Sequence, residues 1–204
     1  MNEEESKVFL KNELKFSDND IENIEVFRDM LLEYNSRYNL ISKNTENTIW
    51  LRHILDSAQL IRHFKNDCSS KLVDLGSGAG FPGFILAIFN KNPEFHVKLY
   101  EKSPVKRGFL ESVKNKIRIN VEIADNIYDK HIEADIIVCR AFKKIKQIFD
   151  ISRENLRKKH KIIILKGKNA QEEINNVSLE SNYSYKLENS VTDKDSKIII
   201  VEVG

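Results

Sequence analysis

The sequence predicts a doubly wound α/β fold, with a mostly parallel sheet that ends in an antiparallel hairpin and a helical extension at the N-terminus. Three observations carry this prediction. Strand-like apolar runs alternate with helical patterns from residue 71 onward, a glycine-rich turn follows the first run, and a short polar turn joins the last two. We assign residues 1–66 to the helical extension and residues 67–204 to the α/β domain.

The extension is predicted to be helical. Residues up to about Lys15 favour a marginal helix or arm. Ser17 is a predicted N-cap, with Asp20 three residues later, and apolar residues then recur at steps of three and four until the helix stops near Asn39. A second helix is predicted over residues 48–64, with four residues facing inward: Trp50, Ile54, Ala58 and Ile61.

The α/β domain alternates its elements. Strands are predicted over residues 72–75, 97–100, 120–124, 135–139 and 162–165, and helices over 84–89, 105–117, 145–159 and 170–177. Strands separated by helices form parallel sheets with helices on both faces.

The end of the chain departs from this alternation. Two final strands are predicted over residues 183–189 and 197–203, and the connection between them is too short for the crossover that parallel strands need. The pair is therefore antiparallel. A parallel sheet that ends in such a hairpin is typical of class I methyltransferases, whereas a nucleotide dehydrogenase more often continues with another helix and parallel strand.

Composition gives mainly negative information. The chain has 33 basic and 31 acidic residues, a net charge of +2, which does not by itself predict nucleic-acid binding. Any basic surface must therefore come from local clusters. Three are present: Lys102, Lys106 and Arg107; Lys143, Lys144 and Lys146; Arg153, Arg157, Lys158, Lys159 and Lys161. The alternative for Lys158 and Lys159 is a solvated C-terminal end of a helix.

The acidic start lacks a secretory signal, and the apolar runs are too short to span a bilayer. Cys68 and Cys139 lie far apart, without a metal or redox motif. We therefore expect a cytoplasmic, metal-free monomer with no membrane association.

The glycine-rich turn is the strongest motif. Gly76, Gly78 and Gly80 follow a strand and precede a helix, where glycine lets the backbone approach a ligand closely. The dinucleotide pattern needs a third glycine at position 81, which is Phe81 here and is followed by proline. A bulky aromatic leaves less room for a pyrophosphate, so the turn favours an adenosyl ligand without phosphates, with Phe81 lining the pocket. The alternative is a turn without a ligand.

Glu101 is the second candidate binding residue, because it closes the predicted strand 97–100. In Rossmann-type sites an acidic side chain near this point accepts hydrogen bonds from ribose hydroxyls. The alternative is a solvated carboxylate paired with Lys102 or Lys106.

The whole pattern resembles the bacterial RsmG (GidB) methyltransferases. The loop that carries the resemblance runs from Leu72 to Gly83 and includes the unusual Phe81-Pro82-Gly83. Further matches fall in order along residues 27–204: Tyr34-Asn35, Tyr38-Asn39-Leu40-Ile41, Arg52-His53-Ile54-Leu55-Asp56-Ser57, Lys106-Arg107, Phe109-Leu110, Arg140-Ala141-Phe142 and Leu165-Lys166-Gly167.

The resemblance implies methylation of guanine N7 in the decoding-centre loop of 16S ribosomal RNA, as free RNA or in the small ribosomal subunit, with S-adenosylmethionine as the methyl donor. By the same resemblance Gly76, Phe81, Arg140 and the pair Asp125-Asn126 contact the donor. One feature departs from the family, which usually has Arg-x-Glu where this chain has Ala124-Asp125-Asn126. An asparagine can still bond an adenine edge.

Guanine N7 has a lone pair and no proton to lose, so the predicted chemistry needs positioning rather than a general base. Arg140 and Lys166 end two apolar strands at the predicted site and are our candidate catalytic residues. Arg140 is expected to bind the donor carboxylate or a phosphate, or alternatively to pair with Glu101 or Asp74. Lys166 is expected to reach an RNA phosphate or simply solvent.

His53 and Asp56 share a helix face, and we expect a structural pair between them. Two other functions stay open at this point. One is a methyltransferase for a small molecule or protein, and the other is a nonenzymatic sensor of the donor or an assembly factor. A nicotinamide oxidoreductase is disfavoured by Phe81 and the final hairpin.

Overall fold

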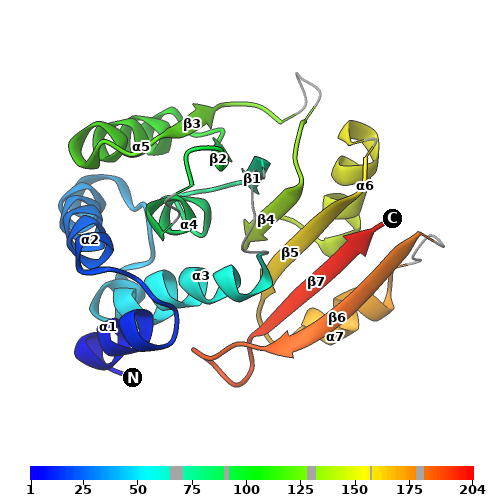
Figure 1. Ribbon diagram of the computed structural model, residues 1–204, viewed down its shortest axis with the longest axis horizontal. Helices are drawn as coiled ribbons and strands as arrows, with labels where there is room; N and C mark the ends of the chain where they lie inside the picture. Colours follow the sequence, from blue (N-terminus) through cyan, green and yellow to red (C-terminus); the bar gives the residue numbers. More distant parts are fainter. Residues whose placement is uncertain (65–70, 90–91, 128–131, 157, 178–181) are drawn as a thin grey trace.

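A computed structural model describes residues 1–64, 71–89, 92–127, 132–156, 158–177 and 182–204. In this part of the chain seven strands form one sheet in the order β3-β2-β1-β4-β5-β7-β6 (Figure 1). The strands are β1 (Lys71–Leu75), β2 (His96–Tyr100), β3 (Val121–Ala124), β4 (Ile136–Arg140), β5 (His160–Lys166), β6 (Tyr183–Asn189) and β7 (Lys197–Val203).

Strands β1 to β5 pair in parallel, whereas β7 runs antiparallel to both β5 and β6. The predicted fold class is therefore confirmed, including the hairpin, whose strands span the predicted residues. Cys68 lies outside the described residues. Cys139 is a buried free thiol.

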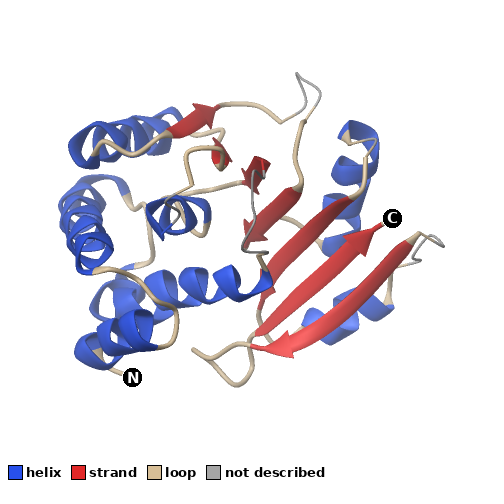
Figure 2. Cartoon of the chain, in the orientation of Figure 1, coloured by secondary structure: helices blue, strands red, loops and turns tan. Residues whose placement is uncertain are grey.

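Helices cover both faces of the sheet (Figure 2). On one side lie α1 (Glu3–Asn12), α2 (Asp18–Tyr38), the turns over residues 43–63, α4 (Gly83–Phe89) and α5 (Pro104–Ile117), and on the other lie α6 (Ile145–Asn155) and α7 (Ala170–Asn175). Because successive strand residues point to opposite faces, Leu72 and Val138 join the first core, and Val73 and Ile137 join the second.

The helical extension shares the first core. Phe27 of α2 is fully buried. Its ring stacks on Phe84 with centroids 5.3 Å apart and meets the edge of Phe81 at the same separation. The predicted caps of this helix are confirmed, since Ser17 and Asp20 form a capping box and Asn39 ends the helix in the left-handed conformation. Aromatic packing thus places α2 directly behind the loop that carries Phe81.

The predicted helix over residues 48–64 was wrong in form. The segment begins earlier and changes pitch, as η1 (Lys43–Thr48), a π-turn η2 (Trp50–Leu55), α3 (Asp56–Ala58) and η3 (Gln59–His63). Trp50, Ile54 and Ala58 are buried as expected. Ile61 is only half-buried, because the three-residue period of η3 rotates it away from the face that a regular helix would present.

Helix α6 ends at Asn155 rather than at residue 159, because Leu156 turns extended and β5 begins at His160. The buried Ser152 hydroxyl and the His160 imidazole meet at 2.6 Å and fix this early end. Lys158 is therefore not a helix-end residue: it pairs with Asp135.

Candidate active site

A cavity of about 860 Å³ opens where the parallel strands end, a size typical of small-molecule sites. Its wall is built from the loops after β1, β2, β3, β4 and β5, together with parts of the helical extension and of the β6–β7 turn. All of the residues proposed from the sequence lie on this wall: Gly76, Gly78, Phe81, Glu101, Asp125, Asn126, Arg140 and Lys166.

The glycine loop is closely packed at Gly76. Its backbone is left-handed, with φ +73°, and an added Cβ atom would lie 2.2 Å from Cδ2 of Phe142. Phe142 itself lines the cavity. Because a side chain at position 76 would displace this ring, the glycine is required both by conformation and by space.

Glu101 holds the same loop from the adjacent strand. Its carboxylate accepts the backbone N–H of Gly78 at 2.9 Å and that of Ser103 at 2.7 Å. Glu101 is buried, with 8% of its surface exposed. The pairing with lysine considered from the sequence is replaced by these two backbone donors. An ionised carboxylate has about four lone-pair positions, so Glu101 keeps acceptor capacity toward the cavity.

Asp74 supports the loop from beneath the cavity. Its Oδ2 accepts the N–H of Gly83 at 2.8 Å, and Gly83 is packed so closely that a Cβ atom would lie 2.7 Å from that of Asp74. Within the described part of the chain, Asp74 Oδ1 has no hydrogen-bond partner. Burial raises the pKa of this carboxyl to about 7.

The raised pKa predicts a pH-dependent stability. A carboxyl with a raised folded-state pKa stabilises the fold fully below its unfolded value of 3.8, and this contribution is lost as the pH rises toward 7. We expect the unfolding free energy of the wild type, relative to Asp74→Asn, to fall by about 2–3 kcal/mol between pH 5 and pH 8. Urea unfolding of both proteins measures this difference, and parallel pH curves would contradict it.

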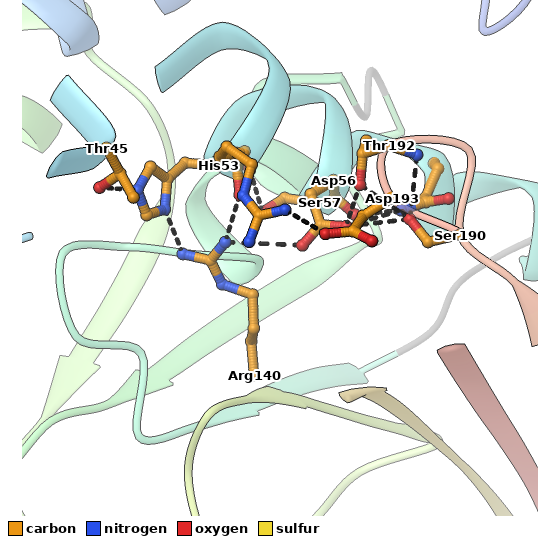
Figure 3. A network of polar contacts seen from close by, with 10 residues as sticks. Thr45, His53, Asp56, Ser57, Arg140, Ser190, Thr192 and Asp193 are labelled. Atoms are coloured by element: carbon orange, nitrogen blue, oxygen red, sulfur yellow. Dashed lines mark hydrogen bonds and ion pairs between the residues drawn. The ribbon is translucent and has the colours of Figure 1, made fainter. Parts of the chain in front are cut away.

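Arg140 lies at the centre of a polar network that joins three distant segments (Figure 3). Its guanidinium donates to the backbone carbonyl of Arg52 at 2.9 Å and to Nδ1 of His53 at 2.6 Å, and it lies 3.6 Å from a carboxylate oxygen of Asp56. It also lies over the Phe81 ring, 5.1 Å from the centroid. The π-turn of η2 places these acceptors together on the cavity side.

The network fixes the state of His53. Arginine only donates, so Nδ1 must accept, and Nε2 then carries the proton toward the Thr45 hydroxyl 2.8 Å away. Burial, together with the Arg140 charge, lowers the pKa of His53 to about 3, so the imidazole is neutral at neutral pH. The expected His53–Asp56 pair is therefore wrong, because Arg140 lies between them. Glu101 and Asp74, the alternative partners expected for Arg140, are likewise not among the groups that its guanidinium contacts in the described part of the chain.

Asp56 extends this network to the β6–β7 turn, which the sequence analysis did not include in the site. Its Oδ1 accepts from Thr192 Oγ1 at 2.8 Å, from Ser190 Oγ at 3.2 Å and from the Gln59 amide at 3.0 Å. Thr192 also lines the cavity. No local sequence pattern could have identified these contacts, because they join residues more than 130 positions apart.

Lys166 is held by the protein itself. Its ammonium donates to both carboxylate oxygens of Glu173, at 2.8 and 3.0 Å, and to the carbonyl of Lys143 at 3.0 Å. The group beside it is therefore a carboxylate of α7, so Lys166 does not simply extend into bulk solvent. Its contact with an RNA phosphate stays a prediction.

The predicted basic clusters are only partly available at the cavity. Lys102, Lys106 and Lys143 line it. Arg107 instead donates to the carbonyls of Glu101 and Lys102 and so closes the turn after β2. Several other members are paired with acids away from the cavity: Lys146 and Arg153 with Asp150, and Lys161 with Glu202.

Among the described residues, no group of three or more His, Cys, Asp or Glu side chains is arranged to hold a metal ion. In the same part of the chain, no helix has the length and apolarity needed to cross a bilayer.

Solved structures share this fold. MtNAS, in a crystal structure titled as its complex with MTA and tNA, gives a TM-score of 0.59 at 11% identity, covering 88% of this chain and 70% of that one. The precorrin-6y C5,15-methyltransferase of Geobacter metallireducens GS-15 gives 0.54 at 15% identity, covering 81% and 90%. The fold, the glycine loop and the acidic end of β2 define the class: an S-adenosylmethionine-dependent methyltransferase of class I.

Sequence relatives specify the family within this class. The family model for GidB, rRNA small subunit methyltransferase G, matches residues 20–199. The ribosomal RNA small subunit methyltransferase G of Rickettsia bellii (strain OSU 85-389) is 37% identical over 180 residues, covering 88% of this chain and 91% of that protein. Its counterpart from Rickettsia felis is 37% identical over 182 residues, covering 89% and 92%. This chain belongs to the rRNA small subunit methyltransferase G family.

Proposed function

We propose that this chain transfers a methyl group from S-adenosylmethionine to N7 of a guanine in the decoding-centre loop of 16S ribosomal RNA. The observation that carries the proposal is the single cavity that brings the glycine loop and Glu101 together with basic residues of its rim. The family, named for methylation of small-subunit rRNA, supplies the substrate class.

The donor is proposed to occupy the part of the cavity beside β1, β2 and β3. Gly76 and Gly78 allow its amino-acid end to approach the backbone closely. In this proposal the remaining acceptor positions of Glu101 accept the two ribose hydroxyls, and Asn126, with Asp125 beside it, bonds the adenine edge. All three residues line the cavity, which supports this assignment. The cavity volume of about 860 Å³ leaves room for a base as well.

The wall of the cavity suits a reaction without a general base. When bound, S-adenosylmethionine supplies an activated methyl group, and guanine N7 offers a lone pair with no proton to remove. His53 is neutral, and both of its ring nitrogens are already bonded. The residues therefore contribute by positioning, which can account for roughly 7–11 kcal/mol of a barrier.

For the two proposed catalytic residues, the contacts favour positioning roles. Arg140 holds η2, whose His53 ring stacks on Phe81 beside the glycine loop, and its charge favours an anionic group of donor or RNA nearby. Lys166 ties the loop after β4 to Glu173 through the carbonyl of Lys143.

We further propose that residues 1–66 act as an extension that completes the cavity wall, and residues 67–204 as the donor-binding domain. The protein would act as a cytoplasmic monomer on 16S rRNA or the small subunit. Leu40, Ile41 and Thr45 of the extension lie on the cavity wall, which supports this division of roles.

The test is transfer of labelled methyl groups to small subunits, naked 16S RNA and total protein from a strain that lacks this chain. We expect label in one guanine of 16S RNA, at a position where borohydride reduction followed by aniline cleaves the RNA chain, as it does at 7-methylguanine. Label in protein or in small molecules alone would support another substrate, and donor binding without transfer would support a nonenzymatic sensor. Either result contradicts the proposal.

A further inference from the structure

An exposed ion pair lies at the mouth of the cavity. Arg52 of η2 and Asp193 of the β6–β7 turn form a salt bridge between positions 141 residues apart. Arg52 lines the cavity, and so do Thr192 and Ser196 on either side of Asp193. The Arg52 side chain is 45% exposed and that of Asp193 is 27% exposed. The bridge therefore lies between the cavity and solvent. Figure 3 shows Asp193 on the same turn as Ser190 and Thr192.

This bridge is not needed to hold the turn in place. Arg140 bonds the backbone carbonyl of Arg52 rather than its side chain. The turn is docked through the buried contacts of Asp56 with Ser190 and Thr192. An exposed salt bridge adds little to stability and opens easily. The Arg52 guanidinium is thus free to change partners without loss of the network beneath it.

Two other cationic groups on the cavity wall are held by protein partners. Arg140 is held among carbonyl, imidazole and carboxylate acceptors, and Lys166 is held by Glu173. Among the described residues at this end of the cavity, Arg52 differs because its side chain pairs with a partly exposed carboxylate on a turn. A guanidinium is planar and presents a fork of donors that matches two phosphate oxygens, and it is always charged.

We propose that Arg52 binds a backbone phosphate of the RNA as the target base enters the cavity. In the free protein Asp193 pairs with the Arg52 guanidinium, and the phosphate displaces the Asp193 carboxylate. This inference rests on the proposed function, since a polynucleotide is the anion that must reach this mouth. Asp193 then acts as an internal competitor, which weakens binding of any single anion and favours a polyanion held at several points.

Equilibrium binding of 16S RNA to the S-adenosylhomocysteine-bound protein tests the proposal. Arg52→Gln raises the Kd about tenfold and lowers the slope of log affinity against log salt by about 1. Asp193→Asn lowers the Kd about threefold. Two matched controls change a side-chain charge outside the pair. Asp195→Asn lies in the same turn and keeps the backbone N–H that residue 195 donates to Asp193 Oδ1. Lys71→Gln changes an exposed residue that pairs with Glu133 and does not line this cavity. Both keep the wild-type Kd within about twofold.

Binding of S-adenosylmethionine by calorimetry shows whether each variant keeps a folded donor site. The proposal is overturned if Arg52→Gln binds RNA like Lys71→Gln, or if Asp193→Asn weakens RNA binding as Arg52→Gln does, which would make the pair structural. Wild-type methyl transfer with such results contradicts this proposal alone. Absence of methyl transfer by the wild type contradicts the proposed function, and this proposal with it.

Discussion

The Gly76→Ala variant is expected to bind S-adenosylmethionine about 100-fold more weakly than the wild type, a loss of about 2.8 kcal/mol. Two physical effects combine. A residue with a Cβ atom at φ +73° carries a conformational cost of about 1–2 kcal/mol. In addition, that Cβ atom would lie 2.2 Å from the Phe142 ring, which must move into the space where the donor is proposed to bind.

Calorimetric titration measures this loss, and Gly108→Ala is the matched control. Gly108 lies within α5, and no atom comes within 4 Å of an added Cβ atom there. The same chemical change should therefore leave donor binding unaltered and raise stability by about 1 kcal/mol through helix propensity. Equal donor affinity in the Gly76 variant and the wild type would show that the glycine loop is not part of the donor-binding site.

The Arg140→Met variant is expected to lose about 2–3 kcal/mol of stability, because Asp56 and the acceptors of η2 lose the cation between them. The Arg140 side chain is 19% exposed, so solvent recovers part of the cost. Catalysis should suffer more: with η2 no longer fixed over Phe81, kcat/KM on RNA is expected to fall about 100-fold.

Denaturant unfolding and steady-state methyl transfer measure the two effects separately. Arg153→Met is the control, because Arg153 is 54% exposed and its pair with Asp150 lies away from the cavity. Its stability should stay within about 0.5 kcal/mol of the wild type. An Arg140 variant that is destabilised but retains full kcat/KM would show that the network holds the fold without positioning the reaction.

Much of the fold could be predicted because its signals are local. The strand β1, the glycine loop and the helix cap at Ser17 each follow from a few neighbouring residues, and the short turn at 190–196 determines that the last two strands are antiparallel. The pitch of residues 43–63 could not be predicted in this way. Its middle part, around Arg52 and His53, is in contact with Arg140, which comes from a strand almost 90 residues later and is not visible to a local pattern.

The candidate site divides in the same manner. Gly76 and Glu101 could be placed on the cavity wall from the sequence because both follow the ends of predicted parallel strands. The roles of His53 and Asp56 were missed because a helical spacing shows that two residues share a face, and not that a third residue lies between them. Lys166 does end a strand as predicted. Its partner Glu173 could not be predicted, because it lies on α7, outside the Leu165-Lys166-Gly167 motif.

The most direct test of the donor site is a crystal structure of the protein with S-adenosylhomocysteine. We expect the ribose hydroxyls on Glu101, the adenine beside Asn126 and the amino-acid end along Gly76, all within the cavity at the carboxyl ends of the strands. A ligand bound elsewhere, for example in the smaller cavity of about 450 Å³ beside Lys98 and Glu122, would contradict this assignment.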